Sequence, residues 1–462
     1  MKIISKKLLS TFAASAIAFS TIAAGQTSDV SAATKKKPAT PEIKNVIFLI
    51  GDGMGTSYTS AYRYLQNSSS TKFVDKSVFD RYLVGQQMTY PEDPAQNVTD
   101  SASAATAMSA GVKTYNAAIA VDNDRSNVKT VLEAAKEQGK STGLVATSEI
   151  THATPAAFGA HDETRKNMNG IADDYFDEKI KGKHKIDVLL GGGKANFVRT
   201  DRDLTKEFKK AGYRYVTSKD QLQKNTNEKL LGLFADGGLD KKIDRNSSTP
   251  SLGNMTNAAL KQLSKNKKGF FLMVEGSQID WAGHDNDIVG AMSEMADFED
   301  AFEAAVEFAK KDKHTLVVAT ADHSTGGFSV AQGGDYNWNP EVIRSITRTP
   351  DFMAEQITDG VAPEKVLKKY IQFPLSEEEI QSVVTVKEKD VTTIDNAIEK
   401  IVNQRSNTGW TTGGHTGEDV NVYAYGPGSD QFRGLLDNTD QAKKIFKIIE
   451  KGAKKQTVIK DR

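Results

Sequence analysis

Acidic and histidine residues follow several apolar runs of this sequence at spacings that suit metal binding. Asp280 and His284 stand four residues apart, so on a helical turn they share one face and can hold one metal ion. Asp322 and His323 follow another apolar run, and His415 lies in a glycine-rich segment before the last one. A lone Asp–His pair is more often a cap or a surface contact, but several pairs at strand ends indicate one shared crevice.

A further acidic residue follows the first apolar run of the chain. Residues 45–50 end in an unbroken hydrophobic run, which is typical of a strand buried on both faces of a parallel sheet. The segment G-D-G-M-G at 51–55 comes next, and ligands of open α/β sheets bind beyond the carboxyl ends of strands. Its spacing differs from the dinucleotide fingerprint G-x-G-x-x-G, so we expect the glycines to give clearance around Asp52. A turn without chemical function is the alternative.

The stretch V-T-D-S-A-S-A-A-T-A-M at 98–108 predicts a tightly packed helix of small residues. A helix that begins at Ser101 points its free N–H groups and the positive end of its dipole at that hydroxyl, which suits an anion such as phosphate. Asp and Ser are also favoured N-cap residues, so a simple cap at Asp100 or Ser101 is the alternative.

The remaining pattern alternates strands with helices. Strand-like runs lie at 142–147, 186–190, 269–274, 315–320 and 422–425. Helical patterns lie at 128–138, 254–263, 289–311 and 442–451. This alternation predicts an α/β fold with a doubly wound, mostly parallel central sheet and helices on both faces. Residues 335–410 are polar and mostly helical in pattern, and we expect them to form an inserted cap region at the carboxyl edge of the sheet.

Composition excludes several classes of protein. The 462 residues include 60 basic and 60 acidic ones, and this balance argues against a nucleic-acid partner. No cysteine is present, so no disulfide can form. Residues 1–33 combine a basic start, an apolar stretch and small-residue cleavage sites, which predicts a cleaved signal peptide without a later transmembrane anchor. We therefore expect a secreted, periplasmic or cell-surface protein in which residues 34–462 form a single α/β domain.

The clustered Asp, Glu, His, Ser and Thr residues favour a metal-dependent hydrolase that acts on an anion. Six motifs extend this interpretation, because together they resemble those of the alkaline phosphatase family over nearly the whole mature chain. The motifs are I-G-D-G-M-G at 50–55, T-D-S-A-S-A-A-T-A at 99–107, H-A-T-P-A-A at 152–157, V-E-G-S-Q-I-D at 274–280, A-T-A-D-H at 319–323 and G-G-H-T-G at 413–417.

The resemblance implies a phosphomonoesterase of broad specificity. By that likeness, Ser101 is the nucleophile that forms a phosphoserine and Arg165 clamps two phosphate oxygens. The implied ligands form three sets: Asp280, His284 and His415 for one zinc ion; Asp52, Asp322 and His323 for a second; and Asp52, Thr154 and Glu275 for magnesium. Two zinc ions can activate the hydroxyl and stabilise the leaving oxygen. Many members of the family are homodimers, and the resemblance allows a homodimer here.

Two positions depart from the best-known bacterial pattern. The family often has Asp where His152 stands and Lys where Trp281 stands. A histidine at 152 can reach a metal or replace a carboxylate that holds water, so magnesium, cobalt and zinc are all open for the third site. Trp281 removes a cation near the phosphate, which changes phosphate release and pH dependence.

Three other functions remain open from the sequence. A phosphodiesterase of the same superfamily needs space for a second ester group where Arg165 lies. A sulfatase needs Cys or Ser in a C/S-x-P-x-R motif, and Ser101 lacks that context. An exported protein that only binds metal or phosphate needs neither Ser101 nor Arg165.

Overall fold

A ten-stranded sheet forms the centre of the computed structural model, which describes residues 42–67, 70–71 and 73–458. The strand order is β16-β2-β15-β10-β1-β9-β3-β6-β8-β7. The strands are β1 Asn45–Gly51, β2 Leu83–Met88, β3 Ser141–Glu149, β6 Val188–Gly192, β7 Arg214–Val216, β8 Leu230–Leu233, β9 Phe270–Gly276, β10 Thr315–Ala321, β15 Val420–Tyr425 and β16 Gly434–Asp437. The predicted signal peptide, residues 1–33, lies outside the described residues.

The sheet is parallel from β10 to β7. The exception is β15, which runs antiparallel to both of its neighbours, β10 and β2. The predicted doubly wound, mostly parallel α/β sheet is therefore confirmed.

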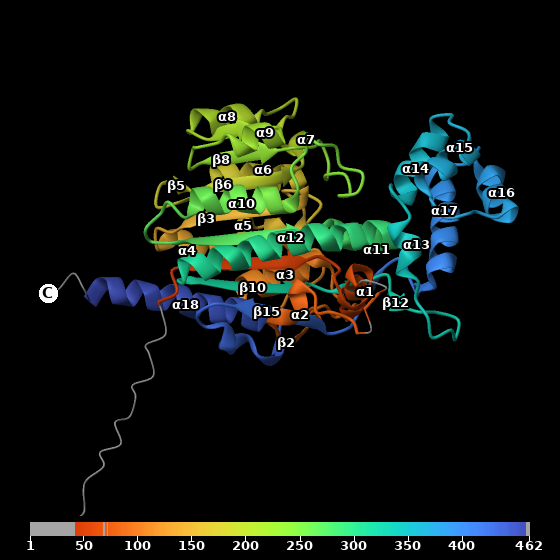
Figure 1. The fold of residues 1–462 in the computed structure, drawn as a ribbon. Coiled ribbons are helices and arrows are strands. Elements are labelled where there is room, and N and C mark those ends of the chain that lie inside the picture. Colours follow the sequence, from red (N-terminus) through yellow and green to blue (C-terminus); the bar gives the residue numbers. More distant parts are fainter. Residues whose placement is uncertain (1–41, 68–69, 72, 459–462) are drawn as a thin grey trace, which may run out of the picture. The chain divides into compact units, whose positions relative to one another are not determined.

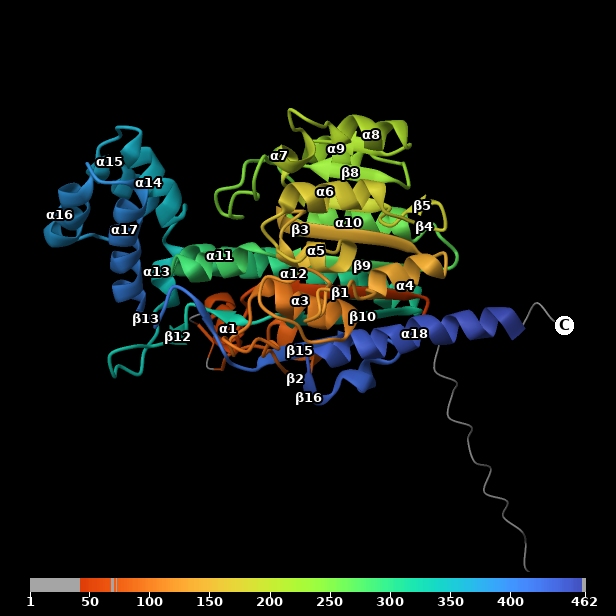
Figure 2. The ribbon, with the colours of Figure 1, turned by 180° about the vertical axis from the view of Figure 1, so that it is seen from behind.

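Side chains of the central strands alternate between two hydrophobic cores, one on each face. In β1, Ile47 and Leu49 belong to one core, and Phe48 and Ile50 belong to the other. Helices cover both faces (Figure 1, Figure 2). The first core contains residues of α1 Thr56–Gln66, α10 Leu252–Leu263 and α12 Ile288–Asp312. The second contains residues of α3 Ser101–Ala110, α4 Val131–Glu137, α5 Ala153–Gly159 and α18 Thr439–Val458.

The long helix α12 illustrates how the sequence sets these elements. Asp287 caps its first turn by accepting hydrogen bonds from two backbone N–H groups, and the helix is followed by Lys313, a left-handed C-cap with φ 63°. Met295, Phe298 and Phe302 recur at helical spacing and are fully buried in the first core. Burial of such a stripe contributes on the order of 2 kcal/mol per large apolar side chain.

The segment between residues 330 and 408 is a helical insertion whose two ends are joined by a separate pair of short strands. It starts at β12 Ser329–Val330 and ends at β13 Thr408–Gly409, which pair with each other. Its helices are α13 Pro340–Arg344, α14 Pro350–Thr358, α15 Pro363–Tyr370, α16 Glu377–Val386 and α17 Val391–Ser406. Three of them begin with proline, which has the right φ and no N–H to leave unpaired. The helical pattern expected for residues 335–410 is present.

Shorter elements complete the described chain. They are α2 Val78–Tyr82, α6 Met168–Asp177, α7 Lys194–Phe197, α8 Leu204–Lys210, α9 Lys219–Gln223, α11 Gln278–His284, the 3-10 turn Ser429–Phe432, β4 Lys179–Ile180, β5 Lys183–His184, β11 Ser324–Thr325 and β14 His415–Thr416. Among the described residues, no helix combines the length and apolar character needed to cross a bilayer.

Candidate active site and metal centre

The predicted chemical residues meet at the carboxyl edge of four neighbouring strands. Asp52 follows β1, Asp322 follows β10, and Glu275 is the second-last residue of β9. His152 opens α5, three residues after β3 ends. Because β10, β1, β9 and β3 are adjacent in the sheet, these four side chains enter one crevice.

Gly53 allows the loop after β1 to lie against α11. It has φ +70°, and an added Cβ would stand 2.7 Å from the Cα of Asp280. Its N–H donates to Asp322 Oδ1 at 3.0 Å. Gly53 therefore gives this loop room against α11 and also orients the carboxylate of Asp322.

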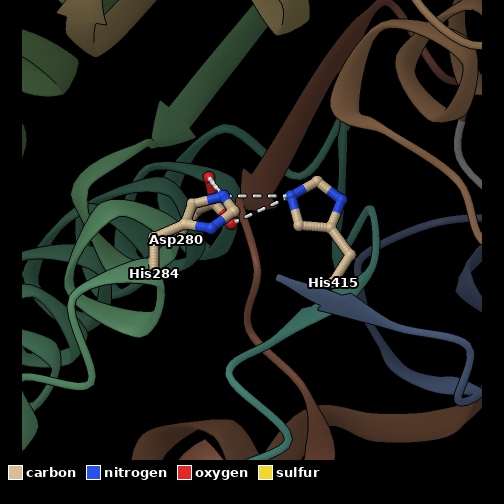
Figure 3. Close-up of side chains that lie close together, drawn as sticks. All are labelled: Asp280, His284 and His415. Carbon is tan, nitrogen blue, oxygen red and sulfur yellow. Dashed lines mark hydrogen bonds and ion pairs between the residues drawn. The ribbon is translucent and has the colours of Figure 1, made fainter. Parts of the chain in front are cut away.

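Asp280, His284 and His415 form the first group of possible metal ligands (Figure 3). The Nδ1 atoms of the histidines lie against backbone oxygens, 2.6 Å from Gly413 O and 2.8 Å from Thr99 O. Both Nε2 atoms consequently face the centre, 3.2 Å apart. The hydrogen bond to Asp280 raises the pKa of His284 to about 9. Two imidazole nitrogens and a carboxylate that face one point fit a bound cation.

Asp52, Asp322 and His323 form the second group, and all three are fully buried. Asp52 Oδ1 and Asp322 Oδ2 each lie 3.3 Å from the same atom, His323 Nε2. The hydroxyl of Ser101 lies 3.2 Å from that nitrogen as well. In a Ser-His-Asp triad the carboxylate contacts the other ring nitrogen, so this arrangement does not fit a triad. Oxygens and a nitrogen that converge on one point fit a cation instead.

The third group adds His152, Thr154 and Glu275 to Asp52. Asp52, His152 and Glu275 can hold one ion together, and one buried atom of each of the four side chains lacks a hydrogen-bond partner: Asp52 Oδ2, His152 Nδ1, Thr154 Oγ1 and Glu275 Oε1. Buried polar atoms are normally paired, so this set fits a bound cation. Burial also raises the pKa of Glu275 to about 7, with Asp322 adding repulsion. Likewise, burial and Asp280 raise the pKa of Asp322 to about 6.

Ser101 and Asp100 divide two tasks at the start of α3. Asp100 is the N-cap, and its carboxylate accepts a hydrogen bond from Ser103 N at 3.0 Å. Ser101 is the first helical residue, and its buried hydroxyl faces Asp52 and His323. The side chain of Ser101 is thus free of the capping role, which the sequence left open between the two residues.

Arg165 contacts Asp100 and His152 at the same crevice. Its Nη1 donates to Asp100 Oδ2 at 3.0 Å, and its Nη2 lies 3.0 Å from His152 Nε2. The edge of the His152 ring meets Trp281, with ring centroids 5.8 Å apart. The two residues that depart from the common bacterial pattern are therefore in contact with each other.

Comparison with known proteins agrees with this geometry. Residues 43–451 match the protein family described as alkaline phosphatase. The chain belongs to the alkaline phosphatase family. It is 68% identical to alkaline phosphatase 3 of Bacillus subtilis (strain 168), over 97% of this chain and 98% of that protein. This likeness along the full length makes it a phosphomonoesterase with phosphate monoester substrates.

Two solved alkaline phosphatases resemble it in structure. The cold-active enzyme from the psychrophile Shewanella sp. has a TM-score of 0.83 and 42% identity, covering 88% of this chain and 99% of that one. The second is a variant of the enzyme from the Antarctic bacterium TAB5 with histidine replaced by glutamate and magnesium bound in its M3 site. It has a TM-score of 0.66 and 32% identity, covering 89% of this chain and 99% of that one.

A fourth group of possible ligands lies apart from the phosphatase crevice. It consists of Glu133, His161 and Glu178. The buried Lys185 already supplies a positive charge there, because its Nζ lies 3.6 Å from Glu133 and closer still to Glu178. This group is therefore an ion-pair cluster within the alkaline phosphatase fold.

Some contacts of the alkaline phosphatase site have no signal in the sequence. The backbone oxygens of Thr99 and Gly413 orient the two histidines, and any residue type can supply them. Thr325 donates a short hydrogen bond to Asp280. Its strand, β11, pairs with β14 and so places His415 beside His323, with ring centroids 3.6 Å apart.

Proposed function

We propose that Ser101 is the nucleophile of this phosphatase. Its hydroxyl gives up its proton to water as Oγ attacks phosphorus, the bond from phosphorus to the ester oxygen breaks, and the leaving oxygen takes up one proton from water to become the alcohol. Water then attacks the phosphoserine and releases inorganic phosphate, which regenerates the hydroxyl. The observation that carries this proposal is the meeting of Ser101 Oγ, His323 Nε2 and two buried carboxylates around one point.

We propose zinc for the first two groups, because their ligands combine carboxylates with neutral imidazoles. Asp280, His284 and His415 would hold one ion. Asp52, Asp322 and His323 would hold the other, next to Ser101. When bound, the ions supply the Lewis acidity that ionises a hydroxyl and stabilises a leaving oxygen.

Arg165 is proposed to hold the phosphate of the substrate. Its guanidinium offers paired donors that match two phosphate oxygens. Asp100 keeps the guanidinium at the mouth of the crevice, and the side chains of this pair are each about one fifth exposed. The free N–H groups at the start of α3 add further donors near Ser101.

The identity of the third metal is proposed to depend on His152. In the TAB5 enzyme, replacement of a histidine by glutamate accompanies magnesium in the M3 site. His152 is the histidine of the third group here, so we expect a nitrogen-tolerant ion such as zinc or cobalt in the native protein and magnesium in His152→Asp. Elemental analysis of both proteins tests this, with His314→Asp at the start of β10 as the matched control. Equal magnesium content in all three proteins would contradict it.

Broad specificity, export and assembly are proposed from the family resemblance. Export after cleavage of residues 1–33 fits the sequence of the leader. Residues 335–410 are proposed as a rim of the crevice, and a homodimer as the assembly. Light scattering of the secreted protein tests the last point.

Two serine variants of one helix test the nucleophile. Ser101→Ala should abolish hydrolysis of an aryl phosphate monoester and leave the metal content unchanged. Ser109→Ala is the matched control, because Ser109 lies on the last turn of α3 and its hydroxyl donates to Ala157 O at 2.6 Å. Near-full activity of Ser101→Ala would refute the phosphoserine mechanism. An aryl diester assayed beside the monoester separates the diesterase alternative.

A further inference from the structure

A lysine-lined cavity lies at the amino-terminal edge of the sheet, opposite the phosphatase crevice. Its volume is about 880 Å³, and six of its lining residues are lysines: Lys136, Lys140, Lys181, Lys183, Lys229 and Lys268. Lys140 precedes β3, Lys229 precedes β8, and Lys268 lies two residues before β9. Because the catalytic residues follow the carboxyl ends of these parallel strands, the cavity is a separate site.

Most of these ammonium groups have no carboxylate partner among the described residues. Lys140 Nζ donates to the backbone oxygens of Lys44 and Lys268, at 2.6 and 2.7 Å. Lys181 Nζ donates to the backbone oxygen of Glu137 at 2.7 Å. Backbone oxygens hold these groups in place without a formal negative charge, and Glu42 acts on Lys140 through its charge.

The two acidic side chains that line the cavity are already engaged. Asp187 pairs with Lys136 at 2.7 Å, and Glu137 pairs with Lys129 outside the cavity. Lys183 and Lys268 are exposed and make no ion pair among the described residues. The cavity therefore carries a strong excess of positive charge in a chain whose net charge is zero.

The titration of neighbouring groups agrees with this excess. The pKa of His184 is lowered by burial, with Lys179, Lys229 and Lys136 adding repulsion. Burial likewise lowers the pKa of Lys140 to about 8. The His184 shift shows that Lys136 and Lys229 act on a neighbouring group through their positive charge, which a bound anion would offset.

The shape and lining of the cavity restrict the class of anion. A volume of this size suits a ligand much larger than one phosphate ion. The lining contains no Phe, Tyr or Trp on which a nucleic-acid base can stack. Several lysines spaced along one cavity match a chain of phosphate groups, since each ammonium is a point charge that needs no fixed orientation of its partner.

We propose that this cavity binds a polyanion of linked phosphate groups and that binding holds the protein by the face opposite its catalytic crevice. The ligand is therefore an anchor, and the catalytic crevice stays open to small phosphate monoesters. The cavity contains none of the residues proposed for catalysis, and only the choice of an inactive variant for the binding assay rests on the role proposed for Ser101.

Binding of a fluorescent linear inorganic polyphosphate tests the proposal. The protein is the full, metal-loaded chain with Ser101→Ala, so that the probe is not consumed. We compare two double variants. One combines Lys183→Glu with Lys268→Glu in the cavity, and the other combines Lys365→Glu with Lys368→Glu on α15, which makes the same charge change on exposed lysines elsewhere. The first pair should weaken binding about thirtyfold and the second about twofold at most, since each lysine charge near an anionic surface has a modest, additive effect.

Three results would overturn the proposal. The first is unchanged affinity in the cavity pair, and the second is an equal loss in the α15 pair, which would show only a general charge effect. The third is binding of single-stranded DNA of equal charge at least as tight as that of polyphosphate. As a control for folding, the two double lysine variants are also made in the protein that keeps Ser101. Each should hydrolyse an aryl monoester as fast as the protein without lysine substitutions.

Discussion

Glu399→Gln should stabilise the protein, and the gain should grow as the pH rises. Glu399 and Asp395 stand four residues apart on α17, and both are at least 95% buried. Glu399 Oε1 and Asp395 Oδ1 have no hydrogen-bond partner. The charged groups that act on them are Lys241, Asp285, Asp287 and Asp351.

The pKa of Glu399 gives the size and sign of the effect. Burial raises it to about 11, with Asp395 adding repulsion, and burial likewise raises the pKa of Asp395 to about 9. The protonated Glu399 supports the fold fully below the usual glutamate pKa, and this support is lost as the pH rises toward 11. Each pH unit in that window removes about 1.4 kcal/mol, so the difference between about pH 6 and about pH 9 is at most about 4 kcal/mol. Glutamine has the same shape and cannot ionise.

Urea unfolding of the metal-loaded protein at several pH values measures this difference. The wild-type curve includes every titrating group, so the quantity to follow is the stability of Glu399→Gln minus that of the wild type. Glu377→Gln at the exposed start of α16 makes the same substitution away from the buried pair and is the control. A constant difference between Glu399→Gln and the wild type across this range would refute the reasoning.

Three further predictions concern the metals and the core. A chelator should remove metal and activity together, and added zinc should restore both. The loss should be faster at acidic pH, because His284 then regains its proton. Hydrolysis that resists the chelator would refute the metal assignment. Gly53→Ala should lower metal content and activity, because its Cβ would stand 2.7 Å from the Cα of Asp280, and elemental analysis beside an activity assay checks this. Arg245→Met should cost about 3–5 kcal/mol in urea unfolding, since it leaves two buried carboxylates without their partner; a loss below about 1 kcal/mol would contradict that view.

The strands that build the site were predictable because they are buried on both faces. β1, β9 and β10 are fully buried along their lengths, and each reads as a continuous apolar run. By contrast, β2 and β16 were not predicted. Both contain exposed residues and follow no clear period, and partners distant in the sequence stabilise them.

The residues of the candidate site were likewise predictable only in part. Asp280 and His284 could be paired from their spacing, because helical geometry alone brings them together. His415 could not be placed beside them from spacing, because a two-residue pairing of β14 with β11 positions it. The bonds that orient its ring come from backbone oxygens, which leave no trace in the residue types.

The crevice joins parts of the chain that are far apart, such as Thr99 and His415, which are 316 residues apart. Three buried carboxylates, Asp52, Glu275 and Asp322, meet only after β10, β1 and β9 have paired. Their repulsion makes the last stage of folding locally frustrated, and a cation relieves it. We therefore expect the loops after these strands to be cleaved by proteases more readily in the metal-free protein than in the metal-loaded one.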